Sequence, residues 1–123
     1  EGTALIGRHT RIGDHSRISD SNIDNFCILG EYVNVERAAI MDASKIGDYI
    51  QISDSIIGRK AFVESTRENP TTIESSVIGN AAQIMKDCRL TRTKVNPGLR
   101  IPPGMTYVDK FLQTYEDIVQ LAS

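Results

Sequence analysis

Two histidines, His9 and His15, are the side chains of this sequence with the most versatile chemistry, and they stand six positions apart. A neutral imidazole can take a proton from a hydroxyl or an amine and so serve as a general base. A catalytic zinc site needs three protein ligands and an open position, which two histidines do not supply. Arg8 and Asp14 directly precede the two histidines. This favours an interpretation of both as solvated residues at bends of the chain.

The remaining reactive side chains form no arrangement that predicts catalysis. Glu116 and Asp117 are adjacent, and adjacent side chains on a helix do not face each other. Asp20 and Asp24 have no evident acid or base partner, so solvation is the favoured interpretation. No glycine-rich turn leads from a strand into a helix, which is the arrangement that cradles phosphate. We therefore expect no catalytic, cofactor-binding or metal-binding residue in this chain.

The composition indicates a soluble protein with an aliphatic core. Of 123 residues, 40% are hydrophobic, 6% are aromatic and none is tryptophan. The net charge is −2, and lysine and arginine form no long run, so we expect neither nucleic acid nor a membrane as partner. No stretch approaches the roughly 20 apolar residues of a membrane span. These features predict a cytoplasmic protein.

Aliphatic residues recur along most of the chain in steps of six, six and five. One series with intervals of 17 residues is Ile6, Ile23, Ile40 and Ile57. The pattern breaks once, where four extra residues are inserted within Ser65–Pro70, and it resumes at Ile73. A helix would need a period near 3.6, so the repeat predicts strands of about four residues joined by corners of about two.

Small residues stand two positions before the aliphatic residues of this series. Residues two apart on a strand point to the same side, so each strand sends one small and one aliphatic residue inward. The small series is Ala4, Ser21, Ala38, Ser55, Ser76 and Thr93. Turn-forming pairs such as Pro97-Gly98 and Pro103-Gly104 occupy the corners. Three strands and three corners close a triangular coil, and about six coils stack into a solenoid.

The predicted fold is therefore an all-β, single-stranded parallel β-helix over residues 1–108, with residues 65–70 as a loop insertion. Coils stack about 4.8 Å apart, so Cys27 in the second coil and Cys88 in the fifth would be about 14 Å apart. A disulfide needs Cα atoms within about 7 Å. We expect two buried, reduced thiols.

The hydrophobic period changes after Tyr107. The apolar residues that follow are spaced as one face of a helix, and they are Phe111, Leu112, Tyr115, Ile118, Val119 and Ala122. We expect a short C-terminal α-helix over residues 109–123, with Asp109 or Thr114 as its N-cap. A solenoid needs a cap, and this helix would cover part of the prism.

Several of these stretches resemble a known family. Ile6–Gly13, Ser55–Gly58 and Ser76–Gly79 are similar to the hexapeptide repeats of left-handed β-helix proteins. The ending Lys94–Gly104 resembles the last coils of the C-terminal domain of sugar-1-phosphate nucleotidylyltransferases. That family includes UDP-N-acetylglucosamine pyrophosphorylases, glucose-1-phosphate thymidylyltransferases and mannose-1-phosphate guanylyltransferases. The left-handed coil is implied by this resemblance alone, because the general crossover rule favours the opposite hand.

The resemblance implies that a catalytic N-terminal domain is missing from this chain. That domain would bind the sugar 1-phosphate, the nucleoside triphosphate and Mg²⁺. The sequence begins at Glu1 without an initiator methionine, which also leads us to expect an upstream segment. The expected role of this chain is oligomerisation and support of the catalytic domain. We expect that the chain alone does not transfer nucleotides.

Two alternatives remain at this point, an acetyl-CoA-dependent acyltransferase of the hexapeptide class and a stand-alone scaffold. Acetyltransferases of that class use a histidine base near a loop that projects from a coil. The loop at Ser65–Pro70 contains no histidine, and both histidines of this chain fall in the first coil. The nucleotidylyltransferase interpretation is therefore favoured over these alternatives.

Apolar side chains also stand at outward positions, mainly beside one series of strands. On this first face of the prism they are Leu5, Ala39, Met41, Ile56 and Val77. A contiguous apolar stripe of this kind is more than scattered surface exposure would give. We expect the C-terminal helix or a second subunit to cover it. By analogy with other left-handed β-helix proteins, a homotrimer is the first expectation.

Overall fold

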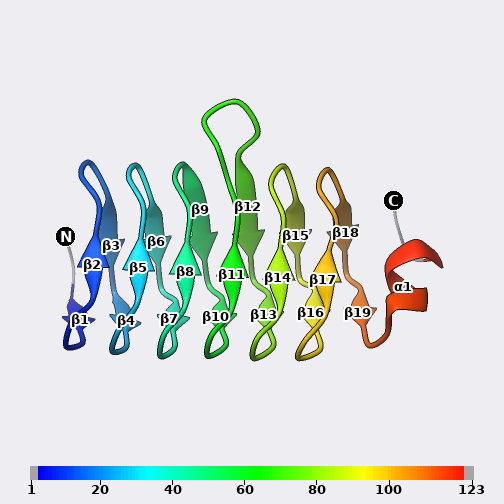
Figure 1. The fold of residues 1–123 in the computed structure, drawn as a ribbon, viewed down its shortest axis with the longest axis horizontal. Coiled ribbons are helices and arrows are strands. Elements are labelled where there is room, and N and C mark those ends of the chain that lie inside the picture. Colours follow the sequence, from blue (N-terminus) through cyan, green and yellow to red (C-terminus); the bar gives the residue numbers. More distant parts are fainter. Residues whose placement is uncertain (1–2, 121–123) are drawn as a thin grey trace.

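The structure is a computed structural model that describes residues 3–120 as a parallel β-helix followed by one short helix. Figure 1 shows the coils stacked along one axis, with the N-terminal coil at one end and α1 (Tyr115–Gln120) at the other. The predicted all-β parallel β-helix of about six coils is confirmed. Its geometry is consistent with the left-handed coil that the resemblance implies.

The described strands form three parallel sheets, one for each face of the prism, in which every strand pairs with the strand three places along the chain. The first sheet contains β1 (Ala4–Ile6), β4 (Ser21–Ile23), β7 (Ala39–Ile40), β10 (Ile56–Ile57), β13 (Val77–Ile78), β16 (Lys94–Val95) and β19 (Phe111–Leu112). The second contains β2 (Arg11–Ile12), β5 (Ile28–Leu29), β8 (Lys45–Ile46), β11 (Phe62–Val63), β14 (Gln83–Ile84) and β17 (Arg100–Ile101). The third contains β3 (Arg17–Ser19), β6 (Asn34–Glu36), β9 (Ile50–Ser53), β12 (Thr71–Glu74), β15 (Arg89–Thr91) and β18 (Thr106–Val108).

The predicted inward positions form the core. Ile40, Ile57 and Ile78 are fully buried in the first sheet. The small residues beside them, Ala38, Ser55 and Ser76, are buried as well, and the serine hydroxyl groups tie successive coils together. Ser55 Oγ donates to Ser53 O (2.7 Å) and accepts from the backbone N–H of Ser76 (3.0 Å). The small polar residue therefore leaves room inside the prism and keeps its own polar atom paired.

Glycine at the start of a corner is required by close packing between coils. A Cβ atom on Gly79 would lie 2.5 Å from Pro97 N in the next coil, and one on Gly58 would lie 2.7 Å from Asn80 N. Among described glycines, positive φ values occur at Gly98 and Gly104. At most of the other described corners, a residue with a side chain adopts this left-handed conformation, including both histidines, Arg37 and Asp54.

The loop insertion lies between β11 and β12, where Figure 1 shows it projecting beyond the other corners. Its base is held by a small hydrogen-bond network. Ser65 Oγ donates to Tyr49 O (3.0 Å) and accepts from Thr71 N (2.9 Å). Thr71 Oγ1 donates to Glu64 O (2.7 Å). These bonds return the chain to register, so that Thr71 pairs with Ile50 as an uninterrupted repeat would require.

The C-terminal helix begins later than the sequence analysis placed it. The expected start at residue 109 is wrong, because Phe111–Leu112 form β19 and pair with Lys94 and Val95. Leu112 stands 17 residues after Val95 and is buried, so the strand repeat continues to this point. Thr114 is the N-cap, since its Oγ1 accepts from Asp117 N (3.4 Å). Residues 121–123, including Ala122 of the expected helix, lie outside the described part.

The first coil departs from the burial that the repeat predicts. Ile6 is 45% exposed, whereas its equivalent Ile23 in the second coil is 1% exposed. Ile12 and Ile18 are only partly buried. Their side chains point inward, but among the described residues no further coil lies on that side. This end of the prism is therefore an open apolar cross-section.

Candidate functional site

The candidate site is the outward surface of the first sheet, where the sequence predicted a contact face. Leu5, Ile56 and Val77 are 64%, 46% and 38% exposed. Ala39 lies between Leu5 and Ile56 along the sheet and is half-buried, and Met41, which directly follows β7, is exposed. Four of the five predicted residues thus stand at outward paired positions of the first sheet, and Met41 follows directly after β7. A surface of this composition suits contact with another protein surface better than contact with water.

The C-terminal helix leaves this face open in the part of the chain that the structure describes. Helix α1 packs at the end of the prism, where Ile118 is buried. Tyr107 Oη donates a 2.6 Å hydrogen bond to Ile118 O and so fastens the helix to the last coil. Burial raises the pKa of the Tyr107 phenol above its usual value. The helix is therefore a cap on the coil, and the predicted cover of the first face has to come from elsewhere.

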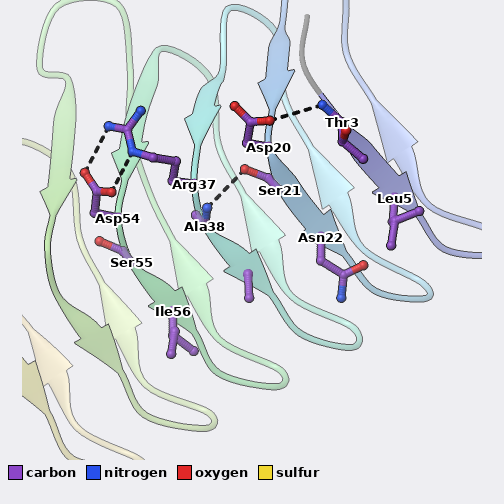
Figure 2. Close-up of a pocket in the computed structure, with 11 residues that line it drawn as sticks. Thr3, Leu5, Asp20, Ser21, Asn22, Arg37, Ala38, Asp54, Ser55 and Ile56 are labelled. Carbon is purple, nitrogen blue, oxygen red and sulfur yellow. Dashed lines mark hydrogen bonds and ion pairs between the residues drawn. The ribbon is translucent and has the colours of Figure 1, made fainter.

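A groove of about 780 Å³ crosses this face near the N-terminal coils (Figure 2). Leu5, Ala39 and Ile56 line its apolar side, three of the five predicted residues. Met41 and Val77 lie outside its lining. The opposite rim is charged and is formed by Asp20, Arg37 and Asp54. These residues stand at the third corner of successive coils, where the chain passes from the third sheet to the first. The groove thus combines an apolar floor with a charged edge.

The charged rim contains an ion pair between Arg37 and Asp54 that the sequence analysis missed. Arg37 Nε donates to Asp54 Oδ1 (2.7 Å) and its terminal nitrogen donates to Asp54 Oδ2 (3.0 Å). Arg92 and Asp109 repeat this two-bond geometry near the other end of the prism. The hydrogen bond from Arg37 holds the pKa of the exposed Asp54 carboxyl below its usual value. The 17-residue spacing of each pair was the signal in the sequence that could have revealed them.

The two histidines belong to separate aromatic stacks at the corners. His9 stacks on Phe26 with ring centroids 5.2 Å apart. His15 stacks on Tyr32 at 4.8 Å, and Tyr32 stacks on Tyr49 at 4.8 Å. Both histidines adopt positive φ values and are exposed. Their interpretation as corner residues is confirmed, and the stacking gives each imidazole a structural contact with the next coil.

The two cysteines are buried and free, as predicted. Cys27 Sγ lies 3.1 Å from Met41 O, and Cys88 Sγ lies 3.2 Å from Pro102 O. Ser44 Oγ donates to Gly58 O in the same way, 14 residues further along the chain. Burial raises the pKa of both thiols above the usual value. Each cysteine therefore takes the place of an inward serine and remains a protonated donor to the next coil.

The described residues 3–120 contain no group of three or more His, Cys, Asp and Glu side chains placed to hold a metal ion. Over the same range, no helix has the length and apolar character needed to cross a membrane.

Stacked six-residue steps on three parallel sheets define a hexapeptide-repeat β-helix domain. Residues 1–102 match the family described as the GMPPB C-terminal domain, and the chain belongs to this family. A curated relative is the bifunctional protein GlmU of Nitrosospira multiformis, which is 26% identical over 126 residues. That match covers 89% of this chain and 27% of GlmU, so the chain spans about a quarter of the length of this relative.

Two solved structures are among those similar to this chain. A mutant of GDP-perosamine N-acetyl transferase from Caulobacter crescentus, in complex with CoA and GDP-perosamine, superposes with a TM-score of 0.58 at 10% identity. It matches 85% of this chain and 50% of its own length. The acetyltransferase domain of PglB from Neisseria gonorrhoeae gives a TM-score of 0.43 at 19% identity, over 85% of this chain and 51% of that domain. At 10% identity, the likeness to the GDP-perosamine N-acetyl transferase concerns the fold alone.

Proposed function

We propose that this chain is the C-terminal β-helix of a sugar-1-phosphate nucleotidylyltransferase, a cytoplasmic enzyme of nucleotide-sugar biosynthesis. The observation that carries the proposal is the family match, which spans residues 1–102 and names a C-terminal domain. The match to part of GlmU gives further support, because this chain spans only 27% of that protein. Catalysis would belong to an upstream domain.

The proposed roles of the β-helix are support of the catalytic domain and oligomerisation. Support is assigned to the open first coil, where Ile6 is 45% exposed and Ile12 and Ile18 are partly buried. An apolar cross-section of this kind is stabilised when another structure removes it from water. Oligomerisation is assigned to the first face, where Leu5 and Ile56 are exposed beside the groove.

The proposed reaction follows from the two substrates of this enzyme class. A phosphate oxygen of the sugar 1-phosphate attacks the α-phosphorus of the nucleoside triphosphate. The bond from the α-phosphorus to the bridging oxygen breaks, and pyrophosphate leaves with the electron pair. Mg²⁺, held by the upstream domain, would neutralise the phosphate charge. The β-helix supplies no group to this step.

The test begins with the intact mass of the protein encoded by the natural gene. A mass several times 13.6 kDa, the mass of this chain, would indicate an upstream domain. That protein should release pyrophosphate from a nucleoside triphosphate only when a sugar 1-phosphate and Mg²⁺ are present. This chain alone is the control and should release none.

Two results would contradict the proposal. One is a natural protein with a mass near 13.6 kDa, and the other is a full-length protein that lacks nucleotidyl transfer but binds acetyl-CoA. The second result would favour the hexapeptide acyltransferase alternative. A natural protein with a mass near 13.6 kDa that does not bind acetyl-CoA would favour a stand-alone scaffold.

A further inference from the structure

The outward residues of the first sheet form one straight row, one residue per coil. Strand pairing fixes the order as Leu5, Asn22, Ala39, Ile56, Val77, Lys94 and Phe111. Figure 2 shows Leu5, Asn22 and Ile56 along this face. The row has an odd number of members because β19 adds a seventh strand to this sheet. Ile56 on β10 is therefore its midpoint.

The row matches itself when its direction is reversed. We propose that the first face binds a second copy of this chain with the two prism axes antiparallel, about a two-fold axis that runs along β10 and passes between the two Ile56 side chains. This inference rests on the proposed oligomerisation role and assigns its partner and geometry. An interface of this kind uses the same patch on both copies, so each contact occurs twice.

The apolar members of the row are complementary in size under this reversal. Leu5 of one copy faces Phe111 of the other, which places the two large end residues together; these side chains are 64% and 44% exposed. Ala39, the small floor residue of the groove, faces Val77. Burial of these side chains is the main source of affinity.

The polar members of the row are complementary in charge. Asn22 and Asp24 lie in the second coil, and the Asn22 amide donates to Asp24 Oδ1 (3.1 Å). Lys94 lies in the sixth coil, with its ammonium group 5.3 Å from the centre of the Phe111 ring. Reversal brings Lys94 of one copy to Asn22 and Asp24 of the other. The opposite arrangement, with parallel prism axes, would place Lys94 against Lys94, and like charges in contact are disfavoured.

The size of the face sets the expected affinity. Six steps of about 4.8 Å give a length of about 29 Å, and about five residues per face give a width of about 17 Å. The two copies together would bury about 1,000 Å², which is at the lower limit of specific interfaces. We therefore expect a dimer whose population depends on protein concentration over the micromolar range.

Sedimentation equilibrium of this chain at several concentrations tests the interface. The chain should form a dimer, and Ile56→Glu should remove it because two carboxylates then meet on the axis. Ile28→Glu is the matched control, since Ile28 is equally exposed, at 47% against 46%, but points out from the second sheet. Circular dichroism should show that both variants are folded. A trimer, a monomer, or a dimer that survives Ile56→Glu would overturn the proposal.

A charge exchange tests the orientation. Asn22→Lys should weaken the dimer at least tenfold, because it places a second cation opposite Lys94. Adding Lys94→Glu should restore the dimer, since each new lysine then faces a glutamate of the other copy. With parallel axes the double variant would stay weakened, which would contradict the antiparallel geometry. Sedimentation measures the mass of this chain without any activity assay. If the chain is a monomer and the full-length protein transfers nucleotides, the dimer interface is rejected and the proposed function is retained.

Discussion

The two ends of the prism carry the same repeat and end in opposite ways. At the N-terminal end, Ile6 points inward and is 45% exposed. At the other end, Leu112 is fully buried and Ile118 of α1 is 4% exposed. The closed end also contains the Tyr107–Ile118 hydrogen bond. An inward aliphatic residue of the same register is thus surface at one end, as Ile6, and core at the other, as Leu112.

This difference shows how a solenoid distributes its stability. Each coil contacts only its neighbours, so an inward side chain is buried by the coils above and below it and not by the repeat itself. Ile57 in the fourth coil has a neighbour on each side and is 0% exposed. Within the described residues, Ile6 has a neighbouring coil on one side only. The comparison therefore predicts large effects of substitution in the middle of the stack, and small effects at its open end.

The largest expected effect is the contrast between Ile57→Ala and Ile6→Ala. Loss of the buried Ile57 side chain should reduce the free energy of unfolding by about 2–5 kcal/mol, because it leaves a cavity. Ile6→Ala should cost less than about 1 kcal/mol, since that side chain is half in water already. Urea unfolding of the isolated chain measures both. Equal costs would show that the first coil is covered in solution.

A smaller effect is expected at the closed end, from Tyr107→Phe. The substitution removes the buried hydrogen bond from Tyr107 to Ile118 O, at a cost of about 1–3 kcal/mol. Tyr115→Phe is the matched control, because that ring is 60% exposed and its hydroxyl makes only a 3.4 Å contact with Gly98 O. Thermal unfolding should separate the two variants. Equal melting temperatures would mean that this bond does not hold the cap.

The smallest effect is expected from the exposed ion pairs of the third corner. Arg37 lowers the pKa of Asp54, so the pair stabilises the protein above the unfolded carboxyl pKa of about 4. That contribution is lost as the pH falls through the lower, folded pKa. Arg37→Gln should therefore reduce the melting temperature slightly at pH 7, and by less at pH 2. High salt should reduce the difference, since both groups are exposed. An unchanged difference at pH 2 would contradict this assignment.

Much of this fold could be predicted from the sequence because each 17-residue repeat forms one coil of the structure. The interval of 17 residues fixed which side chains point inward, and Ser55 and Ile57 lie where it placed them. The same interval also predicted correctly that Cys27 and Cys88 form no disulfide bond. Local steric rules suffice here, because each coil uses the same few positions for small, aliphatic and turn residues.

The remaining features depend on neighbours that periodicity does not describe. Phe111 and Leu112 fit both a helical stripe and the strand repeat. In the structure they form a strand, because they pair with β16. Ile6 is exposed because no coil precedes the first one among residues 3–120, and its own register does not reveal this. The Arg37–Asp54 pair joins two coils through corner side chains, whereas the repeat was read from inward positions.

Hydrogen exchange of the backbone amides in the first coil tests the central claim most directly, namely that this β-helix continues at its open end into the rest of a larger enzyme. Exchange should be compared between the isolated chain and the natural full-length protein. The account predicts fast exchange across β1, β2 and β3 in the isolated chain, and slower exchange of the same amides in the full-length protein. The amides of β10 should be equally protected in both. Unchanged exchange in the first coil would contradict the assignment of this end as the support for a catalytic domain.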